Sequence, residues 1–175
     1  ELVNIGGVDT AEILRNLDFY PPIASWITED KDRVPKGAIR QGAKMVRPLG
    51  RLSLFWNIDL VWAKMRSAIQ RLTSLRLESE QRGVNVFIVS SVCGGTGSGI
   101  FLDVAFLIRS AIERQGLTSS FCYINGVLLL PSAFPTVKDK IGIQSNAYAA
   151  LAELDYFTDD DHDWTIDYGT PTVPT

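Results

Sequence analysis

The sequence predicts an α/β fold with a mainly parallel sheet and helices on both of its faces. Two apolar runs rich in β-branched residues, 84–91 and 121–131, are typical of buried strands. Between them, a glycine-rich turn leads into an apolar helix over residues 100–115, which Gly116 ends. Strand, turn, helix and strand in this order form a βαβ unit, whose two strands run parallel. The predicted class is therefore a Rossmann-like α/β fold.

The remaining elements follow from apolar spacing and from helix-breaking residues. Apolar side chains at intervals of three and four predict three further helices, at residues 9–17, 57–81 and 144–157. Asp9 or Thr10 is the expected cap of the first helix. Prolines and glycines predict loop-rich segments at residues 20–44 and 132–143. Residues 158–175 show little pattern, and we expect them to form a poorly ordered tail.

Length and composition favour a single domain over residues 1–175. The chain has 175 residues, of which 46% are hydrophobic, enough for a sizeable core. No apolar run reaches the roughly 18 residues of a membrane span, so no membrane partner is expected. Cys93 and Cys122 lie in or beside apolar runs, where buried, reduced thiols are expected and fit a cytoplasmic protein. The chain does not begin with methionine and has no signal-peptide pattern, so we expect an internal piece of a longer protein.

Charge is distributed unevenly along the chain. Residues 141–175 contain seven acidic residues and no Lys or Arg. Residues 33–58 contain no acidic residue and six basic ones: Arg33, Lys36, Arg40, Lys44, Arg47 and Arg51. This basic segment either faces a polyanion or is a solvated loop. It lacks the interleaved aromatic residues of single-strand nucleic-acid binders, so we do not expect nucleic acid as a partner.

The glycine-rich turn, Gly94 to Gly99, has the position of an anion site. Ligands of parallel sheets bind beyond the carboxyl ends of the strands, where this turn lies. The helix that follows offers unpaired backbone N–H groups and the positive end of its dipole. Glycines allow positive φ angles and a close approach of the backbone to a phosphate, and the Thr96 and Ser98 hydroxyls add donors. The sequence therefore predicts that this turn binds a diphosphate or triphosphate.

Two common phosphate loops are excluded by residue spacing. A P-loop requires lysine after its last glycine, and Ile100 follows Gly99. A dinucleotide fingerprint requires a glycine where this sequence has Ile100 or Leu102.

Three stretches together resemble the tubulin and FtsZ superfamily. "CGGTGSG" (Cys93 to Gly99) is similar to its signature loop, a small residue followed by G-G-T-G-[SA]-G between a strand and a long helix. "GAKMVRPLGR" (Gly42 to Arg51) is similar to its glycine–alanine loop, which faces the γ-phosphate. "NAYAALAEL" (Asn146 to Leu154) has the spacing of the bacterial members. Within the superfamily, the large bacterial tubulin-like proteins look most similar to this chain. Pro135, however, stands where bacterial members carry an acidic ribose contact.

The resemblance implies an incomplete, tubulin-type GTP-binding domain. It implies GTP or GDP as ligand, with Mg²⁺ held through the nucleotide, and self-association into filaments in the full protein. The implied phosphate contacts are Gly94, Gly95, Thr96, Gly97, Ser98 and Gly99, with Gly42, Ala43 and Arg47 at the terminal phosphate. Hydrolysis in the family uses an acidic loop that is expected beyond Thr175. We therefore expect no catalytic residue in this chain and no GTPase activity from it alone.

Several alternatives remain open from the sequence. The chain is either part of a GTPase or a tubulin-like scaffold or interaction module that does not hydrolyse nucleotide. Asp103, in an otherwise apolar helix, either holds Mg²⁺ through water or makes a structural hydrogen bond. The acidic stretch from Asp159 to Asp163, which contains the single histidine His162, is interpreted as a solvated loop rather than as a metal site. No nucleophile-elbow motif accompanies His162, so a hydrolase triad is not expected.

Overall fold

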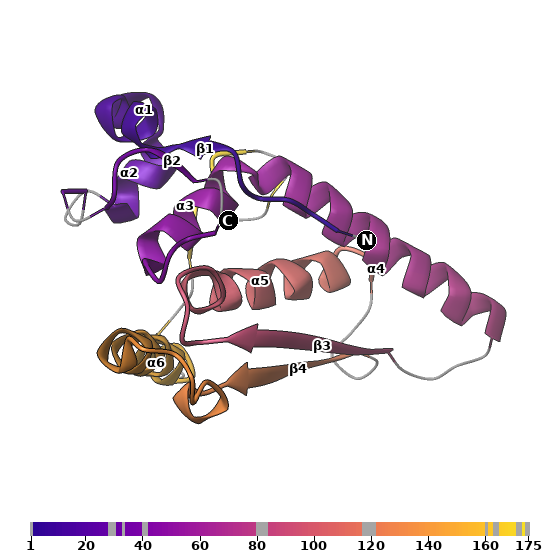
Figure 1. The fold of residues 1–175 in the computed structure, drawn as a ribbon. Coiled ribbons are helices and arrows are strands. Elements are labelled where there is room, and N and C mark those ends of the chain that lie inside the picture. Colours follow the sequence, from indigo (N-terminus) through magenta and orange to yellow (C-terminus); the bar gives the residue numbers. More distant parts are fainter. Residues whose placement is uncertain are drawn as a thin grey trace.

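The computed structural model describes residues 2–27, 31–32, 34–39, 42–79, 84–116, 122–159, 161–162, 165–170 and 173. The N-terminal part contains β1 (Val8–Asp9), α1 (Thr10–Arg15), η1 (Leu17–Phe19), α2 (Pro21–Ile27) and β2 (Ala38–Ile39). The longer elements are α3 (Arg47–Trp56), α4 (Ile58–Ser79), β3 (Val84–Ser91), α5 (Thr96–Glu113), β4 (Cys122–Leu129), η2 (Pro131–Ala133) and α6 (Lys140–Tyr156). In Figure 1, α5 lies between the β3–β4 sheet and a layer formed by α3, α4 and the N-terminal part.

The predicted βαβ unit is confirmed. Strands β3 and β4 are parallel neighbours, paired in register from Val84 opposite Cys122 to Ser91 opposite Leu129. Helix α5 connects them and covers one face of the sheet (Figure 1). Val84, Val86 and Ile124 point to this face and pack against the main core. The chain is thus an α/β fold with parallel strands, as the apolar runs predicted.

The opposite face of the sheet carries exposed apolar side chains. Phe87 is 64% exposed and Val89 67% exposed on β3, and Tyr123, Val127 and Leu129 are exposed on β4. These residues alternate with the covered ones, because successive side chains of a strand point to opposite faces. Helix α6 lies beyond the carboxyl ends of the strands instead (Figure 1). Of the two helix layers that we expected, the described residues form the one that contains α5.

Several element boundaries differ from the sequence prediction. Helix α2 lies in the segment that we predicted as loop, and its two prolines occupy the first turn, where a helix needs no N–H donor. Helix α3 begins at Arg47, with Pro48 likewise in its first turn, inside a stretch interpreted as a phosphate-facing loop. Helix α5 begins four residues before Ile100, and α6 four residues before Gln144. The predicted end of α4 at Gly83 lies outside the described residues.

Of the two expected caps, Asp9 is the N-terminal cap of α1. Its carboxylate accepts hydrogen bonds from the backbone N–H groups of Ala11 and Glu12, at 3.0 and 3.3 Å. The Thr10 hydroxyl instead contacts the carbonyl oxygens of Pro35 and Gly37, at 2.8 Å each. These contacts attach α1 to the segment that contains β2.

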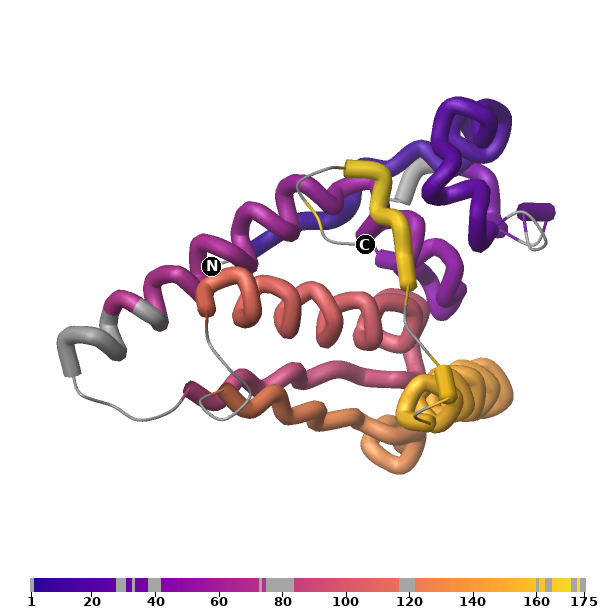
Figure 2. Tube along the Cα trace, turned by 180° about the vertical axis from the view of Figure 1, so that it is seen from behind, coloured from indigo at the N-terminus to yellow at the C-terminus, as the bar shows by residue number. Residues whose placement is uncertain are grey.

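The described part of the tail packs against the helices. Residues 165–170 contain no helix or strand, and Figure 2 shows them running from the side of α6 to α4. Tyr168 and Val173 are buried, and the Thr170 hydroxyl donates to Asp59 Oδ1 at 2.8 Å. Gly169, with φ at +78°, lies directly against Pro22 of α2. The tail therefore contributes side chains to the core.

Helices α3 and α5 cross at a distance that only glycine allows. A Cβ atom on Gly50 of α3 would lie 2.4 Å from the carbonyl oxygen of Gly95 and 2.7 Å from Cα of Thr96. A Cβ on Gly99 of α5 would lie 2.4 Å from the carbonyl oxygen of Arg47. Since the neighbouring atoms belong to the backbone, no side-chain rotation can relieve either contact.

We expect Gly50→Ala to lower the free energy of unfolding by about 2 kcal/mol. Replacing a helical glycine by alanine normally stabilises a helix by about 1 kcal/mol, but overpacking costs about 1–3 kcal/mol or more. The backbone contact should make overpacking the larger effect, measurable by urea denaturation. Gly126→Ala is the control, because its Cβ would meet no atom within 4 Å. Equal stability of the two variants would contradict the close crossing.

Candidate functional site

The turn between β3 and α5 leaves a row of backbone donors at the end of the sheet. Gly95 is the N-terminal cap of α5, and as a glycine it has no side chain to bond the first N–H groups of the helix. Within the described part of the chain, the N–H groups of residues 94–97 have no hydrogen-bond acceptor. The Ser98 hydroxyl contacts the carbonyl oxygen of Gly94, and Ser98 is 1% exposed. The turn therefore presents backbone donors rather than this hydroxyl.

Three of the glycines in the turn are required by close packing. A Cβ on Gly95 would lie 2.6 Å from the backbone nitrogen of Val46 and 2.8 Å from Ala43. A Cβ on Gly97 would lie 2.5 Å from both the Ser90 hydroxyl and the Ser91 carbonyl oxygen. Gly99 is blocked by α3, as described above.

Gly94 differs, because a Cβ there would meet no atom within 4 Å. The expectation of positive φ angles in the turn is wrong, because none of its glycines has one. Its glycines instead admit the neighbouring backbone, and at Gly94 they leave open space.

The glycine–alanine loop, residues 42–46, has an unusual backbone. Gly42, Lys44 and Met45 have φ angles of +77°, +44° and +64°. For the two non-glycine residues this left-handed conformation costs roughly 1–2 kcal/mol each. A hydrogen bond from the Val46 N–H to the Ala43 carbonyl oxygen, at 2.8 Å, closes the loop. The loop is thus strained where it touches the glycine turn.

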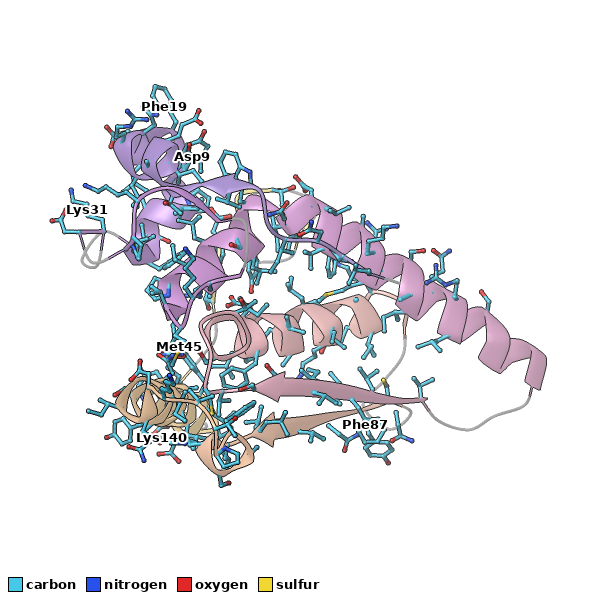
Figure 3. The ribbon with its side chains drawn as sticks, viewed as in Figure 1. Asp9, Phe19, Lys31, Met45, Phe87 and Lys140 are labelled. Atoms are coloured by element: carbon cyan, nitrogen blue, oxygen red, sulfur yellow. The ribbon has the colours of Figure 1, made fainter. Side chains whose placement is uncertain are left out.

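Asn146 of α6 holds both loops together. Its Nδ2 donates to the carbonyl oxygen of Met45 at 2.9 Å and to that of Cys93 at 3.1 Å. Figure 3 shows Met45 between α3 and α6, which is where this contact is made. A single amide therefore connects the glycine–alanine loop, the glycine turn and the third of the resembling stretches.

Arg47 lies beside the turn, but its guanidinium has protein partners. Nε and Nη2 donate to the carbonyl oxygen of Ser98, at 3.3 and 3.0 Å. Nη2 also forms an ion pair with Glu153 of α6. The side chain of Arg47 is 16% exposed and that of Glu153 is 48% exposed. The structure brings Arg47 to the turn, and its contact with a terminal phosphate stays a prediction.

Asp103 makes the structural contacts that we weighed against Mg²⁺ binding. It is 1% exposed, its Oδ1 accepts from the Tyr168 hydroxyl at 2.9 Å, and its Oδ2 lies 3.3 Å from Arg51 Nε. Burial raises the pKa of Asp103, against the lowering effects of Arg51 and of the Tyr168 hydrogen bond, while Glu153 adds to the rise. Both oxygens thus contact protein donors, which is the structural hydrogen bonding that we weighed.

A cavity of about 750 Å³ lies next to the turn, between α2, α3, α5 and α6. Its walls include Trp26, Met45, Arg51, Asn146, Phe157 and Ile166. Arg47, Ser98 and Gly99 also border it, but Gly94 to Gly97 do not, so the open donors lie outside its walls. The sequence did not indicate Trp26 or Ile166, because α2 was interpreted as a loop and the tail showed no periodic pattern.

Some predicted features lie partly outside the described residues. The residues outside the description include Arg33 and Arg40 of the basic segment and Asp160 and Asp163 of the acidic stretch. Among the residues with described positions, no group of three His, Cys, Asp or Glu side chains could hold a metal ion. Over the same residues, no helix is long and apolar enough to span a membrane.

Comparison with known proteins identifies the family. A family model described as tubulin-like matches residues 3–174. The chain belongs to the tubulin-like family. Comparisons of this tubulin-like chain with curated proteins and with solved structures gave no match. The family that the glycine turn and its two companion stretches predicted is thereby confirmed.

We expect Tyr168→Phe to destabilise this tubulin-like chain more at neutral than at acidic pH. Folding raises the pKa of Asp103, so ionisation of this carboxyl lowers the free energy of unfolding as pH rises. Without the Tyr168 donor the pKa rises further and this loss becomes larger. The expected cost is about 1 kcal/mol while Asp103 is protonated and about 2–3 kcal/mol once it is ionised.

Urea denaturation at several pH values between about 4 and about 8 measures this difference. Tyr148→Phe is the control, because Tyr148 is 78% exposed on α6 and lies outside the Asp103 cluster. A Tyr168→Phe cost that does not change with pH would contradict a hydrogen bond to an ionisable Asp103.

Proposed function

We propose that this chain is the guanine-nucleotide-binding part of a tubulin-like protein, in which GTP hydrolysis is coupled to filament assembly. The observation that carries the proposal is the row of unpaired N–H groups at Gly94 to Gly97, at the carboxyl end of a parallel strand. Helix N-termini in this position attract phosphates through their N–H groups and their dipole. Membership of the tubulin-like family supports a nucleotide as the source of those phosphates.

The proposed ligand fits the space at the turn. Gly94 faces open space, so a phosphate can approach its backbone. At Gly95, Gly97 and Gly99, protein atoms fill the position that a Cβ would take. Thr96 adds a hydroxyl, and Ala43 lies against Gly95 of the turn. In this proposal the loop of Gly42 and Ala43 meets the terminal phosphate. Mg²⁺ bound to the nucleotide would neutralise part of the phosphate charge.

In this proposal the chain binds and positions the nucleotide, and residues outside it activate water. The resemblance assigns that step to an acidic loop of a neighbouring subunit, so nucleotide hydrolysis requires assembly. The described residues then contribute electrostatic stabilisation of the phosphates rather than acid–base catalysis.

Both cysteines are free and buried, which supports the proposed cytoplasmic location.

A tubulin-like scaffold that does not hydrolyse nucleotide is the second candidate. Two observations favour it. Arg47 already contacts Glu153 and Ser98, so the terminal phosphate must compete for it. Pro135 stands at the position of an acidic ribose contact in the resembling bacterial proteins. Failure to bind nucleotide would favour the scaffold.

Calorimetric titration of the full-length protein with GTP, GDP and ATP, each with Mg²⁺, tests the proposal. We expect binding of GTP and GDP in preference to ATP, and Gly94→Ala should weaken it about tenfold or more. The added methyl group would stand between the backbone and the phosphate, and tenfold corresponds to about 1.4 kcal/mol.

Gly94→Ala is informative because it should leave the fold intact. Its Cβ enters open space and the residue has no positive φ, so the melting temperature should not change. Gly126→Ala meets the same two conditions on β4 and should leave both affinity and melting temperature unchanged. No binding of any of the three nucleotides at millimolar concentration would favour the scaffold.

A further inference from the structure

We propose that Glu153 sets the discrimination between GTP and GDP, by holding Arg47 until the terminal phosphate of GTP displaces its carboxylate. The inference rests on the proposed nucleotide site and assigns a role to the ion pair between α3 and α6. Nothing in the sequence pairs these two residues, which are 106 positions apart. In the structure they meet beside the first turn of α5.

Arg47 is placed to change partners. Ser98, whose carbonyl oxygen it contacts, lies three residues after Gly95, which is about 4.5 Å along a helix axis. The guanidinium thus contacts the first turn of α5, the helix whose N-terminus carries the N–H groups proposed to hold phosphates. A guanidinium has five N–H donors. In the described part of the chain Nη1 has no acceptor, so a new acceptor can bind before the old contacts break.

Glu153 is a partner that can be released at low cost. Its side chain is 48% exposed, so water can solvate the carboxylate after separation. Partly exposed ion pairs contribute little to stability because solvent screens them. Arg47 is more enclosed, at 16% exposure, and keeps its Ser98 contact on α5. The exchange therefore moves one surface carboxylate and one guanidinium, without unfolding a helix.

The two nucleotides differ in the acceptor that they offer. A terminal phosphate of GTP supplies a multiply charged group with several oxygens, which arginine binds in a bidentate manner. GDP lacks this group, so nothing displaces Glu153 and the Arg47–Glu153 pair persists. Glu153 therefore weakens GTP binding selectively. After hydrolysis it pairs with Arg47 again.

Asp155 provides a matched control on the same helix. It is exposed, two residues beyond Glu153, and its carboxylate has no partner among the described residues. Asp155→Asn removes the same charge as Glu153→Gln without touching Arg47. An effect of overall charge on nucleotide affinity would appear in both variants, whereas release of Arg47 appears in Glu153→Gln alone.

The test is calorimetric titration of the full-length protein with Mg²⁺ and either GDP or the slowly hydrolysed analogue guanylyl imidodiphosphate. We expect Glu153→Gln to raise affinity for the analogue about fivefold, the size of a partly exposed ion pair, and to leave GDP affinity unchanged. Asp155→Asn should change neither affinity. An unchanged ratio of the two affinities in Glu153→Gln overturns the proposal.

A double-mutant cycle with Arg47→Gln separates exchange from direct repulsion between Glu153 and the phosphate. In the Arg47→Gln background the gain from Glu153→Gln should disappear. A gain that persists overturns the exchange and leaves repulsion as the cause. If Arg47→Gln does not fold, Arg47→Met serves in its place, because methionine keeps an apolar stem but has no charge for Glu153 to hold. Failure of both nucleotides to bind the wild-type protein overturns the proposed function as well, which distinguishes the two outcomes.

Discussion

The backbone contact between α3 and the glycine turn is the constraint on which the site depends. Gly50 and Gly99 let the two helices approach until carbonyl oxygens touch Cα positions, and Gly95 admits the glycine–alanine loop on the same side. This contact fixes where α5 begins and where its free N–H groups lie. The chain before α3, next to this contact, has the left-handed conformations of Lys44 and Met45. The glycines serve protein packing first, and among those of the turn Gly94 alone has open space at the position of a Cβ.

Polar side chains from distant segments stabilise this arrangement. Asn146 fixes the two loops, the Arg47–Glu153 pair connects α3 with α6, and Asp103 joins α5 to Arg51 and Tyr168. These contacts differ in burial and therefore in function. The Asp103 cluster is enclosed, so breaking it would leave an uncompensated buried charge. The Arg47–Glu153 pair is partly exposed and is the one that a ligand can exchange. The site thus combines a fixed frame with one movable contact.

The sequence predicted the parts of the fold that are determined locally. Alternating and continuous apolar patterns predicted β3, α5 and β4, and the glycine spacing predicted both the turn and the family. It failed where the outcome depends on distant contacts. Helix α2 was missed because its prolines, which usually break helices, occupy the first turn. Asp103 accepts a hydrogen bond from Tyr168, which is 65 residues away, and no local pattern indicates this contact. The steric reason for Gly95, Gly97 and Gly99 likewise required the position of α3 and the strand end.

Hydrogen exchange at the glycine turn, followed by mass spectrometry of the full-length protein, tests the central claim most directly. Free N–H groups at Gly94 to Gly97 should exchange rapidly in the absence of nucleotide, since the described chain offers them no acceptor. Adding GTP with Mg²⁺ should slow exchange in peptides that cover these residues, because phosphate oxygens become their acceptors. Nucleotide binding that protects other segments and leaves this turn unprotected would contradict the account.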